Sequence, residues 1–191
     1  MDFEKIRSDL SKVLSEKRYQ HTLGVEEIGV RLAERWEENP DEMRTAALLH
    51  DCAKGMRINE QFEFCRQNGI PISREDTLSP GVIHARIGAF LAHWKYHVKE
   101  REILDAIFFH PTGKDNMTRL QKLLFIADYI DPNRDLHVTG DLTELAFEDM
   151  ETAVLEIVIA KNEYLIENRM ILHPDSIKLY NWQIIYIEQR K

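Results

Sequence analysis

The apolar residues of this 191-residue chain recur at helical spacing along most of its length, and this periodicity constrains the fold most strongly. Phe3, Ile6, Leu10, Val13 and Leu14 follow at steps of three, four, three and one, which places them on one face of a helix. No stretch shows the alternation of apolar and polar residues that is typical of a half-buried strand. The sequence therefore predicts an all-α fold.

Capping residues and prolines suggest where helices begin. Asn39-Pro40-Asp41-Glu42 combines a cap residue, a proline in the first turn and acids at the positive end of the helix dipole. Other expected helices, with boundaries uncertain by about two to four residues, cover Asn59–Asn68, His84–Trp94, Glu100–His110, Asn116–Tyr129, Leu142–Ile171 with one break, and the segment from Pro174 onwards. Residues 71–80 are expected to form a loop. Without repeats or flexible linkers, we predict a single domain, 1–191, built as a bundle of roughly eight to ten helices.

Charge and composition narrow the possible partners. The chain is 43% hydrophobic, as in ordinary globular proteins, and its net charge of -8 argues against a general nucleic-acid binder. A small phosphate ligand remains compatible, provided that a metal and a few cations concentrate positive charge locally. The first residues lack the apolar segment of a signal peptide, and no apolar run approaches the ~20 residues of a membrane span. We expect a cytoplasmic protein with no membrane partner.

Six histidine and aspartate residues are candidates for metal ligands. Each stands on, or at an end of, an expected helix, and a helical bundle can gather such distant residues by pointing them inward. They are His21, His50, Asp51, His84, His110 and Asp128. Imidazole and carboxylate suit iron, manganese, zinc, cobalt or nickel. Cys52 and Cys65 form no CxxC motif, so we expect free, at least partly buried thiols instead of a thiolate site.

The apolar surroundings of these residues favour the metal interpretation. His50-Asp51 follows Ala46–Leu49, His110 follows Ala106–Phe109, and Asp128 lies within the apolar run Leu123–Ile130. Burying such ionisable groups is costly without a partner, and a metal would be that partner. An exposed helix C-terminus is the alternative explanation of an isolated His-Asp pair. An exposed helix end becomes a weaker explanation when three such sites, at His50-Asp51, His110 and Asp128, show the same apolar surroundings.

Five sequence blocks, in a fixed order, extend over nearly the whole chain. They are Tyr19–Val25, Ala46–Lys54, His84–Ala89, Ala106–Gly113 and Phe125–Arg134, and a C-terminal His173-Pro174 followed by Tyr180-Asn181 accompanies them. With these blocks the chain resembles the HD-domain phosphohydrolase superfamily, and within it the bacterial YqeK-like symmetrical diadenosine tetraphosphate hydrolases. It differs from that pattern at Pro111, where threonine is usual, and at Asp131, where glutamate is usual.

The resemblance implies a metal centre and a reaction. His21, His50, Asp51 and Asp128 match the shared metal ligands of the superfamily, and His84 and His110 match the additional histidines of members that hold a second ion. Two divalent ions are therefore expected, with iron favoured by the resemblance. A metal-bound hydroxide would attack phosphorus and cleave diadenosine tetraphosphate into two ADP. Asp51 is the expected bridging ligand, and its free oxygen could orient the nucleophile.

Six residues are expected to contact the nucleotide substrate, or an ADP-like or GDP-like product. Lys54 can reach a phosphate as a point charge and is also a catalytic candidate, and Arg134 can clamp phosphate oxygens through two hydrogen bonds. Thr112 and the Gly113 backbone could donate hydrogen bonds to phosphate. His173 and Asn181 are expected at the pocket. For Asn181, the reason is that Asn is a poor intrinsic choice within a helix. Lys54 and Arg134 could equally be ordinary surface and turn residues.

Several alternatives stay open at this point. The chain could be another HD enzyme, such as a nucleotidase or a deoxynucleoside triphosphatase, or a non-catalytic nucleotide sensor that kept the bundle. His93, His97 and His137 match none of the blocks and are expected on the surface. The apolar face of the first helix could cover the core or a partner subunit, so a homodimer is neither predicted nor excluded. Base preference and the number of metal ions are equally open.

Overall fold

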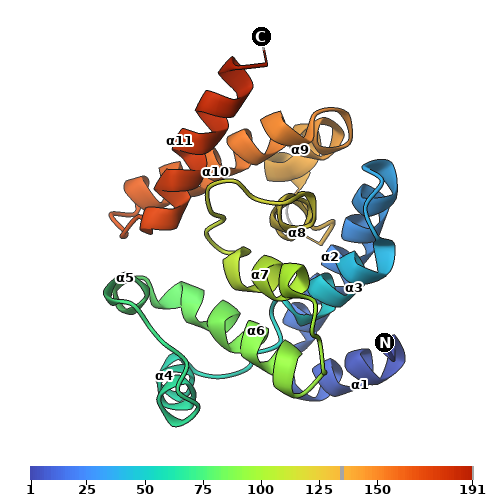
Figure 1. Cartoon of the computed structure of the whole chain (residues 1–191), viewed down its shortest axis with the longest axis vertical. Coiled ribbons are helices and arrows are strands. Elements are labelled where there is room, and N and C mark those ends of the chain that lie inside the picture. The colour runs from blue at the N-terminus through green and yellow to red at the C-terminus, as the bar shows by residue number, and fades with distance from the viewer. Residues whose placement is uncertain (134–135, 191) are drawn as a thin grey trace.

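The computed structural model describes residues 1–133 and 136–190, without the side chains of 136–140. The described residues form eleven α-helices and one short 3-10 helix and no strand, which confirms the all-α prediction (Figure 1). The helices are α1 (Phe3–Val13), α2 (Glu16–Arg35), α3 (Pro40–Leu49), α4 (Ile58–Gln67), α5 (Arg74–Leu78), η1 (Pro80–Val82), α6 (Ile83–Trp94), α7 (Arg101–Phe109), α8 (Arg119–Tyr129), α9 (Leu136–Glu148), α10 (Met150–Glu167) and α11 (Pro174–Glu188).

The helix count exceeds the prediction of eight to ten because the expected loop at 71–80 contains α5. Its start is a capping box: the Ser73 hydroxyl accepts a hydrogen bond from the Asp76 N–H, and the Asp76 carboxylate accepts one from the Ser73 N–H. Because Pro71 and Pro80 flank this short helix, the sequence between them is more typical of a loop. The loop prediction was therefore wrong for Arg74–Leu78.

Side-chain caps mark the starts of α3 and α10. The Asn39 side chain accepts hydrogen bonds from the N–H groups of Asp41 and Glu42, so α3 begins where the sequence indicated. The expected break within 142–171 lies at Asp149, which separates α9 from α10 and caps α10 through the N–H groups of Glu151 and Thr152.

Helix α8 lies near the middle of the molecule, where Figure 1 shows it almost end-on. It packs against α2, α3, α7 and α10. The run from Leu120 to Ala127 is buried along its whole length. Because α8 passes through the core, its last turn carries Asp128 into the interior. Helix α3 acts in the same way: the residues from Thr45 to Leu49 are buried and deliver His50 to the core.

The two ends of the chain are attached differently. Helix α1 buries Ile6 and Leu10 against the core, one of the two possibilities that its apolar spacing left open, whereas Val13 of the same stripe is exposed. Helix α11 projects at the C-terminal end (Figure 1) and is held by a buried polar cluster. The Gln183 amide donates to the Glu151 carboxylate at 2.6 Å, and Lys122 Nζ lies 2.7 Å from the same carboxylate. This cluster ties α11 to α10 and α8.

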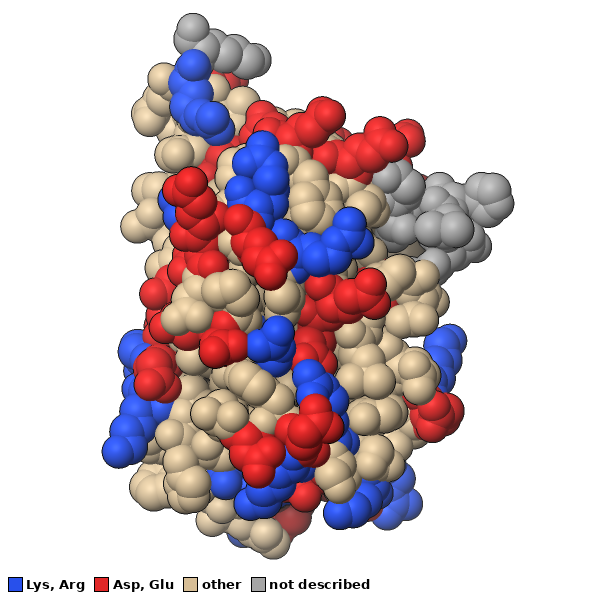
Figure 2. Space-filling view, turned by 90° about the vertical axis from the view of Figure 1, so that its right-hand side faces the viewer, with Lys and Arg blue, Asp and Glu red and all other residues tan. Residues whose placement is uncertain are grey.

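Charged side chains of both signs share the described surface. Figure 2 shows acidic and basic side chains interspersed on one face of the described part of the molecule. No helix in that part is both long and apolar enough to cross a membrane. Cys52 and Cys65 are buried and free, as expected. His93 and His97 are exposed, also as expected, and the His137 side chain lies outside the described residues.

Candidate metal centre

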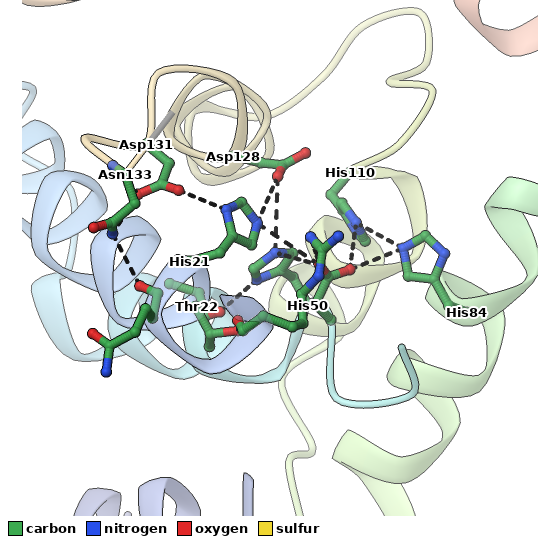
Figure 3. A network of polar contacts seen from close by, with 12 residues as sticks. His21, Thr22, His50, His84, His110, Asp128, Asp131 and Asn133 are labelled. Carbon is green, nitrogen blue, oxygen red and sulfur yellow. Dashed lines mark hydrogen bonds and ion pairs between the residues drawn. The ribbon is translucent and has the colours of Figure 1, made fainter. Parts of the chain in front are cut away.

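All six candidate ligands come together at one place in the core, although they come from five different helices or their ends. Figure 3 labels His21, His50, His84, His110 and Asp128 at this place. His21 is in the second turn of α2, His50 and Asp51 directly follow α3, and His84 is near the start of α6. The other two are His110, at the C-terminal end of α7, and Asp128, in the last turn of α8. The bundle therefore achieves the convergence that the sequence spacing required.

The carboxylate of Asp51 lies between two groups of ligands. Its Oδ2 atom is 3.7 Å from His21 Nε2 and 3.5 Å from His50 Nε2. Its Oδ1 atom is 3.1 Å from His84 Nε2 and 3.6 Å from His110 Nε2. Each carboxylate oxygen thus faces two imidazole nitrogens. The first group is His21 and His50 with Asp51, and the second group is His84 and His110 with Asp51. Each group has ligand atoms close enough together to hold a metal ion. Asp51 is placed to serve both groups.

Asp128 completes the first group. Its Oδ1 atom lies 3.2 Å from His21 Nε2 and 3.9 Å from His50 Nε2. In the second group, His84 Nε2 and His110 Nε2 are only 3.1 Å apart. Two imidazole nitrogens this close together require a shared proton or a shared cation between them.

Hydrogen bonds on the opposite ring nitrogens orient three of the four histidines. His50 Nδ1–H donates to the Ala47 carbonyl at 2.6 Å, and His110 Nδ1–H donates to the Ile107 carbonyl at 2.8 Å. His21 Nδ1–H donates to the Asp131 carboxylate at 2.7 Å (Figure 3). Each of these bonds fixes the tautomer in which Nε2 is free to bind a metal.

Unsatisfied buried atoms show that a cation fits this site. His21 Nε2, His50 Nε2 and Asp51 Oδ1 are buried and have no well-aligned hydrogen bond, although Asp51 Oδ1 lies close to His84 and His21 Nε2 lies close to Asp128. Buried polar atoms are nearly always paired in folded proteins, so a cluster of orphaned ligand atoms points to a missing partner. The donor set of imidazole and carboxylate suits a divalent transition metal.

The ionisation of the site also favours a cation. Burial alone would raise the pKa of the Asp51 carboxyl, but the surrounding imidazoles, His50 foremost, hold it well below its ordinary value. Burial likewise opposes ionisation of Asp128, yet the hydrogen bond from His21 keeps its pKa well below the ordinary value. Burial lowers the pKa of His110 to about 4. The site therefore holds ionised carboxylates beside a neutral imidazole at neutral pH.

His21 differs from His110 because carboxylates surround it. Burial would lower the pKa of His21, but hydrogen bonds to Asp128 and Asp131 outweigh that effect and raise the pKa to about 9. Without a metal, His21 therefore carries a proton at neutral pH. A metal that binds Nε2 must displace this proton.

Sequence reasoning missed two residues that contact these ligands directly. The Arg18 guanidinium donates to Asp51 Oδ2 at 2.8 Å, on the side of the site that opens to solvent. Arg18 lies one turn before His21 on α2, and this spacing was its available signal. Asp131, noted only as a departure from the family pattern, is the carboxylate that orients His21.

A cavity of about 750 Å³ adjoins the metal centre, with Asp128 in its wall. Of the predicted nucleotide contacts, Thr112 and His173 line this cavity. His173 also caps α11 by accepting a hydrogen bond from the Asp175 N–H, and its Nε2 atom lies 3.3 Å from Asp76 Oδ1. The wall also includes the polar or charged residues Asp128, Lys161, Asn162 and Arg169, but most of its surface is apolar, as the wall of a nucleoside pocket is expected to be.

The other predicted nucleotide contacts are not gathered at this cavity. Lys54 is half-buried beside the second group, where its charge adds to the effect of burial in lowering the pKa of His84. The Gly113 N–H already donates to the Phe109 carbonyl at 2.7 Å, so it is not available to a phosphate. Asn181 is exposed on α11 and is not among the residues that line the cavity. Arg134 lies outside the described residues.

Gly113 has a packing role in place of the predicted phosphate contact. Its φ of +64° lies in the left-handed region that favours glycine. A Cβ atom at this position would lie 2.3 Å from Leu179 Cδ2, so the turn after α7 can approach α11 only without a side chain.

Comparison with known proteins agrees with this geometry. The model of the HD domain family matches residues 18–133, which include all six candidate ligands. A Bacillus subtilis protein named symmetrical bis(5'-nucleosyl)-tetraphosphatase is 32% identical over 96% of this chain and 98% of its own length. A Halalkalibacterium halodurans protein of the same name is 33% identical over 88% of this chain and 89% of its own.

A solved structure shows the same architecture. It is a Clostridium acetobutylicum protein described as an HD superfamily hydrolase involved in NAD metabolism, with 34% identity and a TM-score of 0.92. The similarity covers 100% of this chain and 99% of that protein. The family model, the relatives and the ligand geometry agree, and the chain belongs to the HD domain family.

Proposed function

We propose that this protein hydrolyses diadenosine tetraphosphate symmetrically, releasing two ADP. The observation that carries the proposal is the Asp51 carboxylate, which faces two imidazoles through each oxygen beside a cavity of about 750 Å³. The full-length relatives named symmetrical bis(5'-nucleosyl)-tetraphosphatase support the choice of substrate. A nucleotidase or a deoxynucleoside triphosphatase would use a similar metal centre, but these relatives favour the dinucleoside substrate.

Two divalent ions, with iron as the first candidate, fit the two groups of ligands. His21, His50, Asp51 and Asp128 would hold one ion, and His84, His110 and Asp51 would hold the other. Metal ions at this position supply Lewis-acid chemistry: they lower the pKa of water and neutralise charge on phosphoryl oxygens. Manganese, zinc, cobalt and nickel suit the same nitrogen and oxygen donors.

The chain's own residues position the substrate and prepare the site. The ionised Asp51 carboxylate lies between the two groups. Hydrogen bonds on Nδ1 hold His21, His50 and His110 with Nε2 directed toward the site. The apolar cavity wall would bury a nucleoside and exclude water from it. The Thr112 hydroxyl donates to the Gly113 carbonyl, so this hydroxyl would have to rotate away from that carbonyl to donate to a phosphate.

The assignments of phosphate and nucleoside contacts remain proposals. Lys54 would place an ammonium group near the phosphates on the His84 side of the centre. His173 would line the nucleoside pocket while it caps α11. We likewise propose a single domain over 1–191, since the main hydrophobic cluster takes residues from α1, α2, α3 and α6 to α11, and a smaller cluster joins α4 to α6.

Product analysis tests the proposal directly. The protein, purified without added metal and analysed for its elemental content, is incubated with diadenosine tetraphosphate, dGTP and AMP, and the products are separated by chromatography. ADP as the only product of diadenosine tetraphosphate is the expected result. Release of ATP and AMP, or turnover of dGTP or AMP alone, would overturn the symmetrical assignment.

A pair of variants tests the metal centre. Asp51→Ala is expected to abolish metal binding and hydrolysis together. Asp41→Ala removes the same side chain from the exposed first turn of α3 and is expected to keep both. Hydrolysis at the wild-type rate by Asp51→Ala would refute the centre. If the wild type shifts its melting temperature with ADP but hydrolyses nothing with any divalent metal, the protein is a nucleotide sensor.

A further inference from the structure

The cavity beside the metal centre differs in charge from the protein as a whole. The chain carries a net charge of -8, but the described residues that line the cavity include two cations, Lys161 and Arg169, and one carboxylate, Asp128. Asp128 is itself a candidate metal ligand, so a bound ion would neutralise it. The cavity therefore offers a net positive environment, which favours an anionic ligand.

One face of α10 supplies the polar part of the cavity wall. Val158, Lys161, Asn162 and Leu165 all line the cavity, and their spacing of three, one and three places them on a single helix face. Packing alone would place apolar residues at all four positions. A cation and an amide between Val158 and Leu165 instead suggest recognition of a ligand.

The position of Lys161 relates it to the metal centre. Its ammonium lies 4.5 Å from the centre of the Phe125 ring, and Phe125 precedes Asp128 by one turn on α8. Lys161 and Asp128 also line the same cavity. The ammonium is therefore within electrostatic reach of the metal centre, at the cavity side.

Asn162, the next residue, has an unsatisfied acceptor. Its Oδ1 atom is buried and has no hydrogen-bond partner. Buried side-chain oxygens of this kind are normally paired in folded proteins. Because Asn162 lines the cavity, a ligand in the cavity can supply the missing N–H or O–H donor.

We infer that Lys161 and Asn162 bind one nucleoside diphosphate half of the substrate from the α10 side of the cavity. The Lys161 ammonium contacts the phosphates of that half, and Asn162 Oδ1 accepts a hydrogen bond from its nucleoside. This inference rests on the proposed function for the identity of the ligand. Lys161 then balances the negative charge on the diphosphate that leaves, and it makes the same contact with the product ADP.

Calorimetric binding of ADP and of adenosine to the full-length protein separates the two contacts. Lys161→Met keeps an unbranched side chain and removes the charge. We expect ADP to bind this variant roughly tenfold to a hundredfold more weakly, the usual worth of a hydrogen bond to a charged group. Adenosine, which lacks phosphate, should bind it as tightly as the wild type. Asn162→Leu should weaken both ligands by similar factors.

Two further variants serve as controls. Lys161→Arg keeps the charge and should restore most of the ADP affinity. Lys178→Met removes a lysine charge from α11 at an exposed position outside the cavity lining, so it should bind ADP as the wild type does. Lys161→Gln, a polar and uncharged replacement, stands in for Lys161→Met if the latter does not fold.

The outcomes distinguish this inference from the proposed function. Wild-type ADP affinity in both neutral variants of Lys161, or an equal loss of ADP and adenosine binding, would overturn the role of Lys161. Unchanged binding by Asn162→Leu would overturn the role of Asn162. A third result is that the variants of Lys161 and Asn162 bind ADP and adenosine as expected while the wild type releases no ADP from diadenosine tetraphosphate. That result would refute the proposed function but support the α10 contacts.

Discussion

Gly24→Ala is expected to weaken metal binding although it changes no metal ligand. Gly24 lies one turn after His21 on α2, and a Cβ atom there would be 2.0 Å from Asp131 Oδ1 and 2.5 Å from Asn133 Nδ2. Real Cβ atoms essentially never approach other heavy atoms below 3.0 Å. Asp131 is buried and holds His21 through a 2.7 Å hydrogen bond, so alanine must displace the group that orients this imidazole.

The expected effect is large on metal affinity and small on stability. Loss of a carboxylate that orients a metal-binding histidine typically lowers metal affinity by about ten- to a hundredfold, and we expect a loss in this range. Alanine favours a helix over glycine by about 1 kcal/mol, while overpacking costs about 1–3 kcal/mol. The free energy of unfolding should therefore fall by about 0–2 kcal/mol, which leaves the protein folded.

Metal titration of metal-free protein, with urea unfolding in parallel, measures both effects. Gly29→Ala is a matched control on the same helix. Its Cβ atom would meet Met43 Cε at 2.4 Å, but that atom ends a flexible side chain that can move aside. We expect Gly29→Ala to bind metal as the wild type does. Wild-type metal affinity in Gly24→Ala, or an equal loss in both variants, would refute the role assigned to Asp131.

Three more predictions concern ionisation and buried charge. Because the pKa of His21 is about 9 without metal, metal binding at pH 7 should release one proton, and the apparent metal affinity should rise about tenfold per pH unit up to pH 9. Calorimetry in buffers of different ionisation enthalpy measures this proton release, and its absence would contradict the prediction. Arg18→Gln removes a cation that competes for Asp51 Oδ2, so metal should bind several-fold more tightly in a direct titration without substrate; weaker binding would contradict this competition. Lys122→Met leaves the buried Glu151 carboxylate without its cation and should lower the free energy of unfolding in urea by about 3–5 kcal/mol, whereas a change below 1 kcal/mol would argue against a buried pair.

Helix positions were predictable because their signals are local. Asn39 caps α3 and Asp149 separates α9 from α10 through hydrogen bonds to residues two or three positions away. The short α5 escaped prediction because five residues carry too little periodicity to be recognised between two prolines. Its capping box, Ser73 with Asp76, was the available signal.

The convergence of the candidate metal ligands was also predictable, since ionisable residues in apolar helices are costly to bury without a partner. His50 and Asp128 follow apolar runs that prove to be buried, and His110 follows a run in which Ala106 and Ile107 are buried. By contrast, the nucleotide contacts were chosen by chemical type and by resemblance. Gly113 turned out to fill a packing position, and Asn181 lies on the exposed side of α11.

The sequence by itself determined the fold class, the helix ends and the kinds of donor atom in the centre, because these depend on residues close together along the chain. Only the tertiary structure decided that Asp51 faces two groups of imidazoles, that Asp131 orients His21 from 110 positions away, and that Lys161 faces the cavity. These relations depend on how whole helices pack against one another. Spacing within a helix specifies the face on which a residue lies, but not which distant residue meets it there.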